Sequence, residues 1–365
     1  MILHLITDDK FSDSVVKQFF AKEMMSEFIL LSYTDRMQYF HYSSHIYKII
    51  NPYKEFEMNQ LLTYISNYSS VVFHGFYYPW QVWLLNRWPK HVKIAWVCWG
   101  GEIYGQPELQ YSFLKPFSKF AFWIHLRKND NNDGKIFPKN LIRTANYCLT
   151  NMKEEYDYVM NYLNSDMKHL SFNYYSINDT IGDLIDKRCR GNNIFLGNAA
   201  TIESNHIEAL IDLKKLGVED RQIVIPLSYG SPWVRNMCIK IGKFLFKDKL
   251  LPIVNFLPLS EYNALMLSCS VMIQPHLREH AHGNIMTALW LGLRVYLSEN
   301  GIDYKHFKSI GCKVYSIEQD LRRCNPNVFS PMTDEDVAYN RQVLLSVYGQ
   351  EHINATNREI VKQLA

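Results

Sequence analysis

Residues 270–301 read SVMIQPHLREHAHGNIMTALWLGLRVYLSENG, and this stretch decides the fold. It starts with a short apolar run that ends at Gln274, passes through a polar turn, and enters an apolar-periodic segment that Gly292 terminates before a second apolar run. A strand, an amphipathic helix and a strand in this order form a parallel pair, because parallel strands need a crossover connection. The stretch therefore predicts part of a parallel α/β sheet.

The same alternation extends in both directions from this stretch. Short β-rich runs recur between longer helical patterns, five in the first half (MILHLIT, EFILLSY, SSVVFHGF, VKIAWVCWG, NYCLT) and six in the second (NIFLGN, RQIVIPLSYG, LPIVNFLP, SVMIQP, LRVYLS, CKVYS). This doubled set predicts two Rossmann-like domains. We expect the first domain in residues 1–175, the second in 190–333, and helices in 334–365 that pack back towards the first domain.

Composition narrows the functional classes. The chain has 365 residues, more than one hydrophobic core usually supports, and is 47% hydrophobic and 21% charged, as expected of globular domains. A formal charge of +3 is too small for a general nucleic-acid binder. Seven scattered cysteines without a CxxC pair predict a reducing compartment, and no apolar run approaches the roughly 20 residues of a membrane helix. We expect no signal peptide, and any membrane contact is expected to be peripheral.

The turn within the opening stretch is the richest candidate site. In open α/β sheets ligands bind beyond the carboxyl ends of the strands, and Gly283 and Asn284 begin the predicted helix at such an end. A helix start offers unpaired amides and a positive dipole to a diphosphate. A zinc site is the weaker alternative, because the histidine spacing matches no common motif; we expect no metal. Further polar side chains in this turn are His276, Arg278, Glu279, His280 and His282.

Two other strand ends of the second half carry candidate binding residues. NIFLGN ends at Gly197 and Asn198, where a glycine lets backbone approach a phosphate, although a Gly-Asn pair is also an ordinary turn. IVIPLSYG offers Tyr229, which could stack on a base or simply pack in a turn. The neighbouring candidates are Ser204, Asn205, His206, Ser228 and Gly230.

The first half carries the candidates for a general base on the acceptor side. Glu102 and His74 follow predicted strands, and Asp9, next to Asp8, follows the first strand. Glu102 could instead be an acid that only complements a helix dipole. Gly75, Gly100 and Gly101 accompany these residues at the strand ends.

Residues 111–128, YSFLKPFSKFAFWIHLRK, are aromatic and basic and contain no acid. This composition suits a surface that meets anionic lipid headgroups. The alternative is a core helix with a solvated basic edge, interrupted at Pro116.

Several of these stretches resemble a known family. FHGFYYPWQVWLLN, WVCWGGEIYG, FLGNAATIESNHIEAL, VIPLSYG, LPLSEYNALMLSCSV and the RxxxxGxxxxxxxxG frame of REHAHGNIMTALWLG occur in the order found in the TDP-4-acetamido-4,6-dideoxygalactose (Fuc4NAc):lipid II transferases, glycosyltransferase family 56. The resemblance runs from the first strand to about Glu299. It implies a GT-B fold, in which two Rossmann-like domains face across a cleft and a C-terminal helix crosses back.

The resemblance also implies substrates and site residues. It implies a dTDP-activated deoxyamino sugar as donor and an undecaprenyl-diphosphate-linked oligosaccharide as acceptor, with the protein peripheral on the cytoplasmic face of the bacterial inner membrane. Such an enzyme acts in enterobacterial common antigen or O-antigen synthesis. HLREHAH is richer in histidine and charge than its family counterpart, so another dTDP-deoxyamino sugar is also possible. The residues carried over are Gly197, Asn198, Asn205, His206, Tyr229 and Gly283 for the donor, and His74, Gly75, Trp99 and Gly100 for the cleft.

The mechanism expected is direct displacement at the anomeric carbon. Many retaining GT-B enzymes carry two glutamates eight residues apart at this turn, whereas here Glu279 is followed at that distance by Thr287. The alternatives are a nucleotide-sugar epimerase of GT-B-like fold, which would change its donor without an acceptor, and a sugar-nucleotide-binding scaffold that catalyses no transfer.

Overall fold

The computed structural model describes residues 1–365 except 22–23, 35, 129–135, 219 and 324–326. The chain forms two compact units, which we describe separately. The first unit comprises Met1–Gln106, Gly134–Ser176 and Gln350–Ala365; the second comprises Pro107–Asp133 and Ile177–Gly349. Among the described residues, no helix has both the length and the apolar character needed to cross a bilayer.

The first unit contains a seven-stranded parallel sheet in the order β3-β2-β1-β4-β5-β6-β7. In this Rossmann-like order the connections leave in opposite directions from β1 and β4, so the ligand-binding crevice is expected at their carboxyl ends. The strands are β1 (Ile2–Thr7), β2 (Ser26–Leu31), β3 (Lys48–Ile50), β4 (Ser70–His74), β5 (Lys93–Val97), β6 (Tyr147–Thr150) and β7 (Lys168–Ser171).

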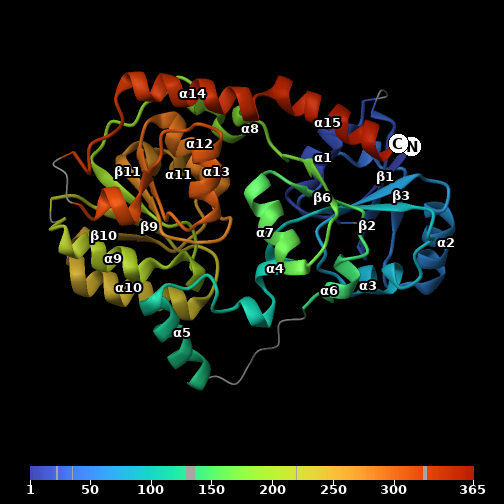
Figure 1. The fold of residues 1–365 in the computed structure, drawn as a ribbon, viewed down its shortest axis with the longest axis horizontal. Helices are drawn as coiled ribbons and strands as arrows, with labels where there is room; N and C mark the ends of the chain where they lie inside the picture. Colours follow the sequence, from blue (N-terminus) through green and yellow to red (C-terminus); the bar gives the residue numbers. More distant parts are fainter. Residues whose placement is uncertain (22–23, 35, 129–135, 219, 324–326) are drawn as a thin grey trace. The chain divides into compact units, whose positions relative to one another are not determined.

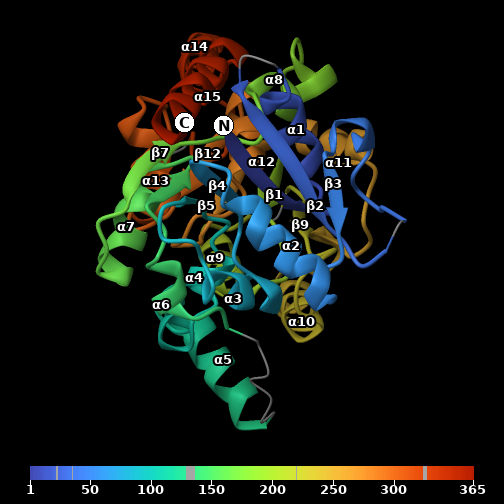
Figure 2. The same ribbon diagram turned by 90° about the vertical axis from the view of Figure 1, so that its right-hand side faces the viewer.

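Helices cover both faces of this sheet. One core cluster joins strand residues such as Ile6 and Val72 to Phe19 of α1 and Leu364 of α15. Figure 2 shows α1 and α15 on one side of the sheet and α2 and α3 on the other. The helices of this unit are α1 (Ser12–Phe19), α2 (Glu55–Ile65), α3 (Pro79–Leu85), α4 (Gly101–Tyr104), α6 (Lys139–Ile142), α7 (Lys153–Leu163) and α15 (Gln350–Leu364), with a 3₁₀ turn at Ser43–His45.

The second unit contains a six-stranded parallel sheet in the order β10-β9-β8-β11-β12-β13. Numbered within the unit this order is 3-2-1-4-5-6, that of the Rossmann fold, and its reversal point lies between β8 and β11. The strands are β8 (Asn193–Leu196), β9 (Ile223–Pro226), β10 (Leu250–Ile253), β11 (Cys269–Gln274), β12 (Arg294–Leu297) and β13 (Tyr315–Ser316).

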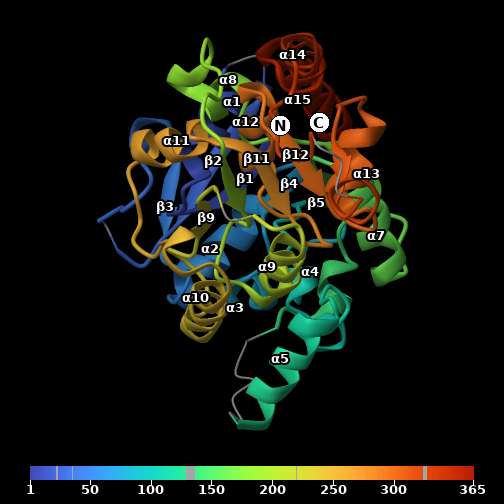
Figure 3. The same ribbon diagram turned by 90° about the vertical axis from the view of Figure 1, so that its left-hand side faces the viewer.

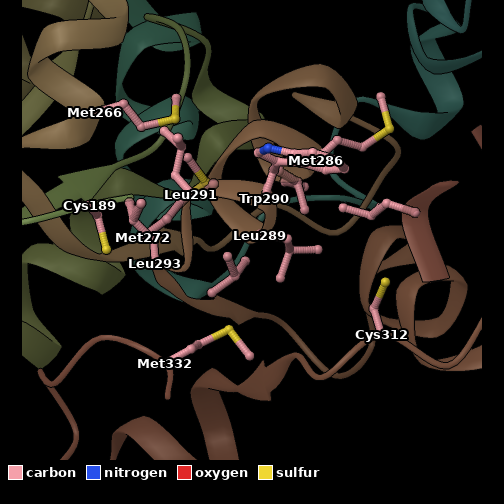
Figure 4. Packing of buried hydrophobic residues seen from close by; sticks show 14 of the residues in the cluster. Cys189, Met266, Met272, Met286, Leu289, Trp290, Leu291, Leu293, Cys312 and Met332 are labelled. Atoms are coloured by element: carbon pink, nitrogen blue, oxygen red, sulfur yellow. The ribbon is translucent and has the colours of Figure 1, made fainter. Parts of the chain in front are cut away.

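Two hydrophobic clusters lie on opposite faces of the second sheet. One, drawn in Figure 4, packs Met272 of β11 against α12 and α14; the other packs Ile273 against α9 and α10. Figures 1 and 3 show these helix pairs on opposite sides of the strands. The helices are α5 (Pro116–Lys128), α8 (Ile177–Ile181), α9 (His206–Lys215), α10 (Pro232–Phe246), α11 (Leu259–Leu267), α12 (His282–Leu291), α13 (Ile302–Ser309) and α14 (Asp334–Tyr348), with short helical turns at Pro107–Leu109, Gly182–Leu184, Ile202–Ser204, Lys247–Lys249 and Ile317–Leu321.

The structure confirms two parallel α/β sheets and adds three features. Edge strands β3 and β7 had no sequence signal, because they are short and half exposed. Residues 107–128 pack with the second unit, against α9, rather than with the sheet from which they emerge. Helix α12, expected to be amphipathic, is buried on nearly all sides and begins at His282, one residue before Gly283. The six described cysteines are buried and unpaired, and Cys324 lies outside the described residues.

Candidate functional site

The reversal point of the second sheet is built around Gly197, which follows β8. Its φ of +70° lies in the left-handed region, and a Cβ at this position would lie 2.2 Å from Nε2 of His206. The buried Gln274, at the end of β11, donates from Nε2 to the Gly197 carbonyl at 3.0 Å. Only glycine satisfies both the backbone angle and the close approach, so the sequence fixes the backbone path at this strand end.

A hydrogen-bonded cluster of amides and phenols adjoins Gly197. Asn284 of α12 donates from Nδ2 to Oδ1 of Asn198 and to the hydroxyl of Tyr262, the latter at 2.8 Å. Asn198 in turn donates from Nδ2 to the Tyr229 hydroxyl at 2.5 Å. The structure thus brings together Asn198 and Tyr229, from the segments after β8 and β9, and Asn284 from the first turn of α12. Tyr262, on α11, was not predicted; its only sequence signal was its position within LPLSEYN.

The loop from Pro275 to Ala281 leads into the start of α12. Ala281 has φ +64° and its carbonyl accepts the first helical hydrogen bond, from the amide of Ile285 at 3.0 Å. The first amides of a helix have no partner within the helix, and they carry the positive end of its dipole. The Asn284 side chain, in the first turn of α12, bonds the Asn198 side chain. The helix start therefore lies next to Gly197 and Asn198. The helix start thus offers backbone amides and the positive end of its dipole at the predicted diphosphate position.

Asp303 on α13 fixes this loop and was not predicted. Its Oδ2 bonds Nε2 of buried His276 at 2.9 Å and accepts the backbone amide of His280 at 3.2 Å. Asp303 therefore joins His276, near the start of the loop, to His280, near its end. A buried aspartate 27 residues after His276 leaves no local pattern in the sequence that would have connected the two residues.

Two histidines of this turn, His280 and His282, add no positive charge near neutral pH. Burial lowers the pKa of His280 and of His282 well below the usual range, so both rings are neutral and act only as dipolar donors or acceptors. His282 also points into the core, where its ring packs 5.3 Å from Phe307 and 5.1 Å from Tyr348. Arg278 adds a guanidinium, a group that stays charged in proteins, to this turn.

Glu279 lies in the same loop, and its pKa is raised. Its pKa is raised to about 7, mainly by burial and also by the neighbouring carboxylate of Asp303, while Arg278 lowers it in part. The carboxyl is therefore partly protonated near neutral pH. At the position eight residues later, Thr287 is buried and its hydroxyl bonds the Gly283 carbonyl at 2.9 Å, so α12 supplies no carboxylate there.

The side chains of Ser204 and Asn205 form hydrogen bonds with other parts of the second unit. The Asn205 side chain accepts the Lys115 amide at 2.8 Å and donates to the Phe113 carbonyl at 3.0 Å, so it ties residues 113–115 into the second unit. Ser204 is buried and bonds Thr201. His206 is fully buried, which lowers its pKa to about 3. Gly230 has φ +106° and lies against the Ala200 backbone, and Ser228 accepts a hydrogen bond from Arg235 through its carbonyl.

In the first unit, His74 ends β4 at the reversal point. Its Nε2 lies 3.2 Å from Nδ1 of His4, and its Nδ1 lies 2.9 Å from the hydroxyl of Tyr174, which accepts from Nε1 of Trp99 at 2.6 Å. Burial lowers the pKa of His74 well below its usual range and that of His4 to about 3. His74 is thus a neutral member of a buried chain, and protonating it as a base would be costly.

The Glu102 carboxylate is turned inward. It is buried, and its Oε1 accepts from Nε1 of Trp96 at 2.9 Å and from the Trp99 amide at 3.1 Å. Burial raises its pKa, and these hydrogen bonds lower it in part. Glu102 lies in the first turn of α4, where the alternative of a dipole-complementing acid places it, and its carboxylate bonds the turn that precedes this helix. Gly100, with φ +86°, and Gly101, whose amide donates to the Tyr77 hydroxyl at 3.1 Å, belong to the same turn.

Asp9 is the most accessible of the three predicted bases. It follows β1, is half buried, and uses Oδ1 to accept the Phe11 amide at 3.0 Å. Its neighbour Asp8 instead accepts three backbone amides, those of residues 38–40, at 2.7–2.9 Å. Gly75, with φ +80°, lies beside Tyr77 and Trp99 at the same edge.

Comparisons with known proteins identify the fold. No protein-family model matches the sequence, and no curated protein matches it. Solved structures do match over the full chain: a glycosyltransferase from Rickettsia africae ESF-5 (TM-score 0.64, 13% identity, 100% of this chain and 98% of that one), Anabaena HepE in complex with UDP and glucose (0.60, 9%, 100% and 98%), and a UDP-forming α,α-trehalose-phosphate synthase from Burkholderia vietnamiensis (0.62, 7%, 100% and 99%). At these identities the likeness is one of fold, and the fold is GT-B.

Proposed function

We propose that the protein is a glycosyltransferase whose second unit binds a nucleotide-diphosphate sugar. The observation that carries this proposal is the reversal point between β8 and β11, where Gly197, the Asn198–Tyr229–Asn284 cluster and the start of α12 lie together. Backbone amides at a helix start and the Arg278 guanidinium suit a diphosphate leaving group. The full-length likeness to a protein solved with UDP and glucose supports a nucleotide sugar as the class of donor.

The finer identity of the substrates rests on the sequence resemblance. We propose dTDP-4-acetamido-4,6-dideoxyhexose as the donor and an undecaprenyl-diphosphate-linked oligosaccharide as the acceptor, which makes the protein a hexosyltransferase of envelope polysaccharide synthesis at the cytoplasmic face of the inner membrane. Support for membrane contact comes from α5. Its exposed residues Phe117, Phe120 and Trp123 form an apolar stripe, and the Arg127 guanidinium lies 3.7 Å from the centre of the Trp123 ring.

The proposed reaction is a single displacement. The acceptor hydroxyl oxygen forms a bond to the anomeric carbon while the bond from that carbon to the diphosphate oxygen breaks, and the nucleoside diphosphate leaves with the electron pair. Asp9 takes the proton of the acceptor hydroxyl. The carboxylate has one oxygen engaged with the Phe11 amide, which orients it, and is half exposed, whereas Glu102 and His74 are buried among partners. Helix-start amides and Arg278 stabilise the charge that develops on the diphosphate.

A matched pair of variants tests the function and the base together. Transfer is measured with dTDP-, UDP- and GDP-activated sugars and a lipid-diphosphate glycan acceptor. We expect transfer only with the acceptor present and best with dTDP-sugar. Asp9→Asn should lower kcat by about 10²–10⁴ while dTDP affinity stays unchanged. Glu102→Gln, which keeps the shape of a buried side chain, should keep most of the turnover.

Two outcomes contradict this account. Conversion of the donor without an acceptor would indicate an epimerase, and binding without any transfer would indicate a scaffold. Equal turnover in Asp9→Asn and the unmodified protein would remove Asp9 from the mechanism without affecting the assignment of the donor site.

A further inference from the structure

Five aromatic side chains gather at the carboxyl edge of the first sheet, and we call them the aromatic platform: Phe11, Tyr77, Trp99, Tyr174 and Tyr175. They follow β1, β4, β5 and β7, so four chain segments converge there. Phe11 stacks on Tyr174 with ring centres 4.6 Å apart and lies 5.3 Å from Trp99, and Trp99 lies 5.6 Å from Tyr77. This is the edge at which open α/β sheets bind ligands.

The orientation of these rings is unusual. Tyrosine and tryptophan usually bury the ring and keep the polar tip in water. Here the Trp99 Nε1 donates inward to the Tyr174 hydroxyl at 2.6 Å, which also bonds His74 at 2.9 Å, and the Tyr175 hydroxyl donates to the Lys10 carbonyl at 3.0 Å. Phe11, Trp99, Tyr174 and Tyr175 are only partly buried, and Tyr77 is 39% exposed. The polar tips therefore lock the rings in place while ring surface remains at the sheet edge.

Polar groups surround the exposed ring surface. The Asp9 carboxylate lies next to Phe11 through the Phe11 amide, and the Lys10 ammonium lies 4.8 Å from the centre of the Phe11 ring. A ligand matching this surface has an apolar face for the rings and hydroxyls at its rim for a carboxylate. A pyranose ring has this construction, with C–H groups on its faces and hydroxyls around its edge. A nucleotide would bring its phosphates near the Asp9 carboxylate, which repels them, and near the Lys10 ammonium, which attracts them, so charge alone does not favour it.

We propose that the aromatic platform binds a pyranose ring of the acceptor glycan and presents its hydroxyl to Asp9. This rests on the proposed transferase function, since it specifies where the acceptor binds. The rings exclude water from one face of the sugar, and their hydrogen-bonded tips remove the entropy cost of ordering them on binding. The class of ligand is thus a carbohydrate with an exposed C–H face.

Saturation-transfer NMR on the full-length protein tests the platform without catalysis. The probes are free glucose, mannose and N-acetylglucosamine at millimolar concentration. We expect magnetisation transfer from the protein to the C–H protons of at least one sugar. Phe11→Leu, which keeps an apolar side chain but removes the ring, should weaken this binding about fivefold. Phe256→Leu, at an 86% exposed phenylalanine of the second unit, is the matched control and should leave it unchanged.

The nucleotide separates this proposal from the donor site. Saturating dTDP should leave the sugar signal in place, and dTDP should bind Phe11→Leu as tightly as the unmodified protein. No transfer to any probe, equal binding by Phe11→Leu, or displacement of the sugars by dTDP would each overturn the platform as an acceptor site. None of these results would contradict the proposed donor site. If dTDP does not bind the unmodified protein, that result contradicts the proposed function itself.

Discussion

At the scale of single residues, Gly197 joins the fold to the proposed donor site. Its left-handed backbone angle and its closeness to His206 are two independent reasons why this position requires glycine. The sequence singled out Gly197 as a candidate binding residue, because a glycine directly after a predicted strand is a local signal. It could not predict that Tyr262 and Asp303 complete the site, since both reach it through side chains from other helices.

Gly197→Ala should destabilise the protein and abolish nucleotide binding. The left-handed backbone angle alone costs about 1–2 kcal/mol, and the contact with His206 adds to it. Gly217→Ala is the matched control, because Gly217 also has φ +70° but no atom within 4 Å of an added Cβ. Urea unfolding should show a larger loss for Gly197→Ala than for Gly217→Ala, and equal losses would show that the His206 contact is unimportant.

Buried neutral histidines should make the fold sensitive to acid. The pKa of His4 is lowered to about 3, so below its unfolded value of 6.5 the folded chain binds fewer protons than the unfolded chain. The stability that His4 contributes is thus complete above pH 6.5 and is lost as the pH falls towards 3, by about 2 kcal/mol at pH 5. Urea unfolding measures the decrease in the free energy of unfolding between pH 7 and pH 5. This decrease should be smaller for His4→Gln than for the unmodified protein, and equal decreases would contradict the lowered pKa of His4.

At the scale of elements, the alternation of apolar runs and helical patterns predicted the sheets well. Buried parallel strands such as β4 and β11 are continuous apolar runs, which the sequence displays directly. The first helix of the expected segment 334–365 begins with an N-terminal cap, in which the Thr333 hydroxyl accepts the Asp336 amide at the start of α14. The packing of α5 was not predictable, since its partners Glu208 and Trp233 lie about ninety residues or more away in the sequence.

Helix α5 should govern binding to anionic membranes. Phe120 is 60% exposed and Trp123 lies beside it, with ring centres 5.9 Å apart. The double variant Phe120→Ser/Trp123→Ser removes apolar surface without touching the packed face, so we expect at least about tenfold weaker binding to phosphatidylglycerol vesicles in a sedimentation assay.

Phe244→Ser on α10 provides the control for this vesicle assay. Phe244 is 84% exposed and lies outside the basic aromatic segment, so its loss should leave vesicle binding unchanged. Equal binding by the α5 variant and the unmodified protein, or equal losses in both variants, would contradict a specific role for α5.

At the scale of the whole molecule, the chain does not divide at one point. Residues 107–128 leave the first sheet and are held in the second unit, where the Lys115 ammonium bonds Glu318 at 2.9 Å and the Ser298 hydroxyl at 2.7 Å. In return α15 belongs to the first unit, where the hydroxyls of Ser69 and Ser70 donate to the Leu364 carbonyl. The domain ranges expected from the sequence, 1–175, 190–333 and 334–365, are continuous stretches of chain. They could not include these exchanges, which depend on tertiary contacts.

The most direct test of the central claim is a crystal structure of the protein with dTDP bound. The account predicts that the diphosphate lies within hydrogen-bond distance of the amides at the start of α12 and of Arg278, with the nucleoside near Tyr229 and the Asn198–Asn284 pair. Phosphates bound anywhere else, or a structure in which this helix start makes no contact with the nucleotide, would contradict it.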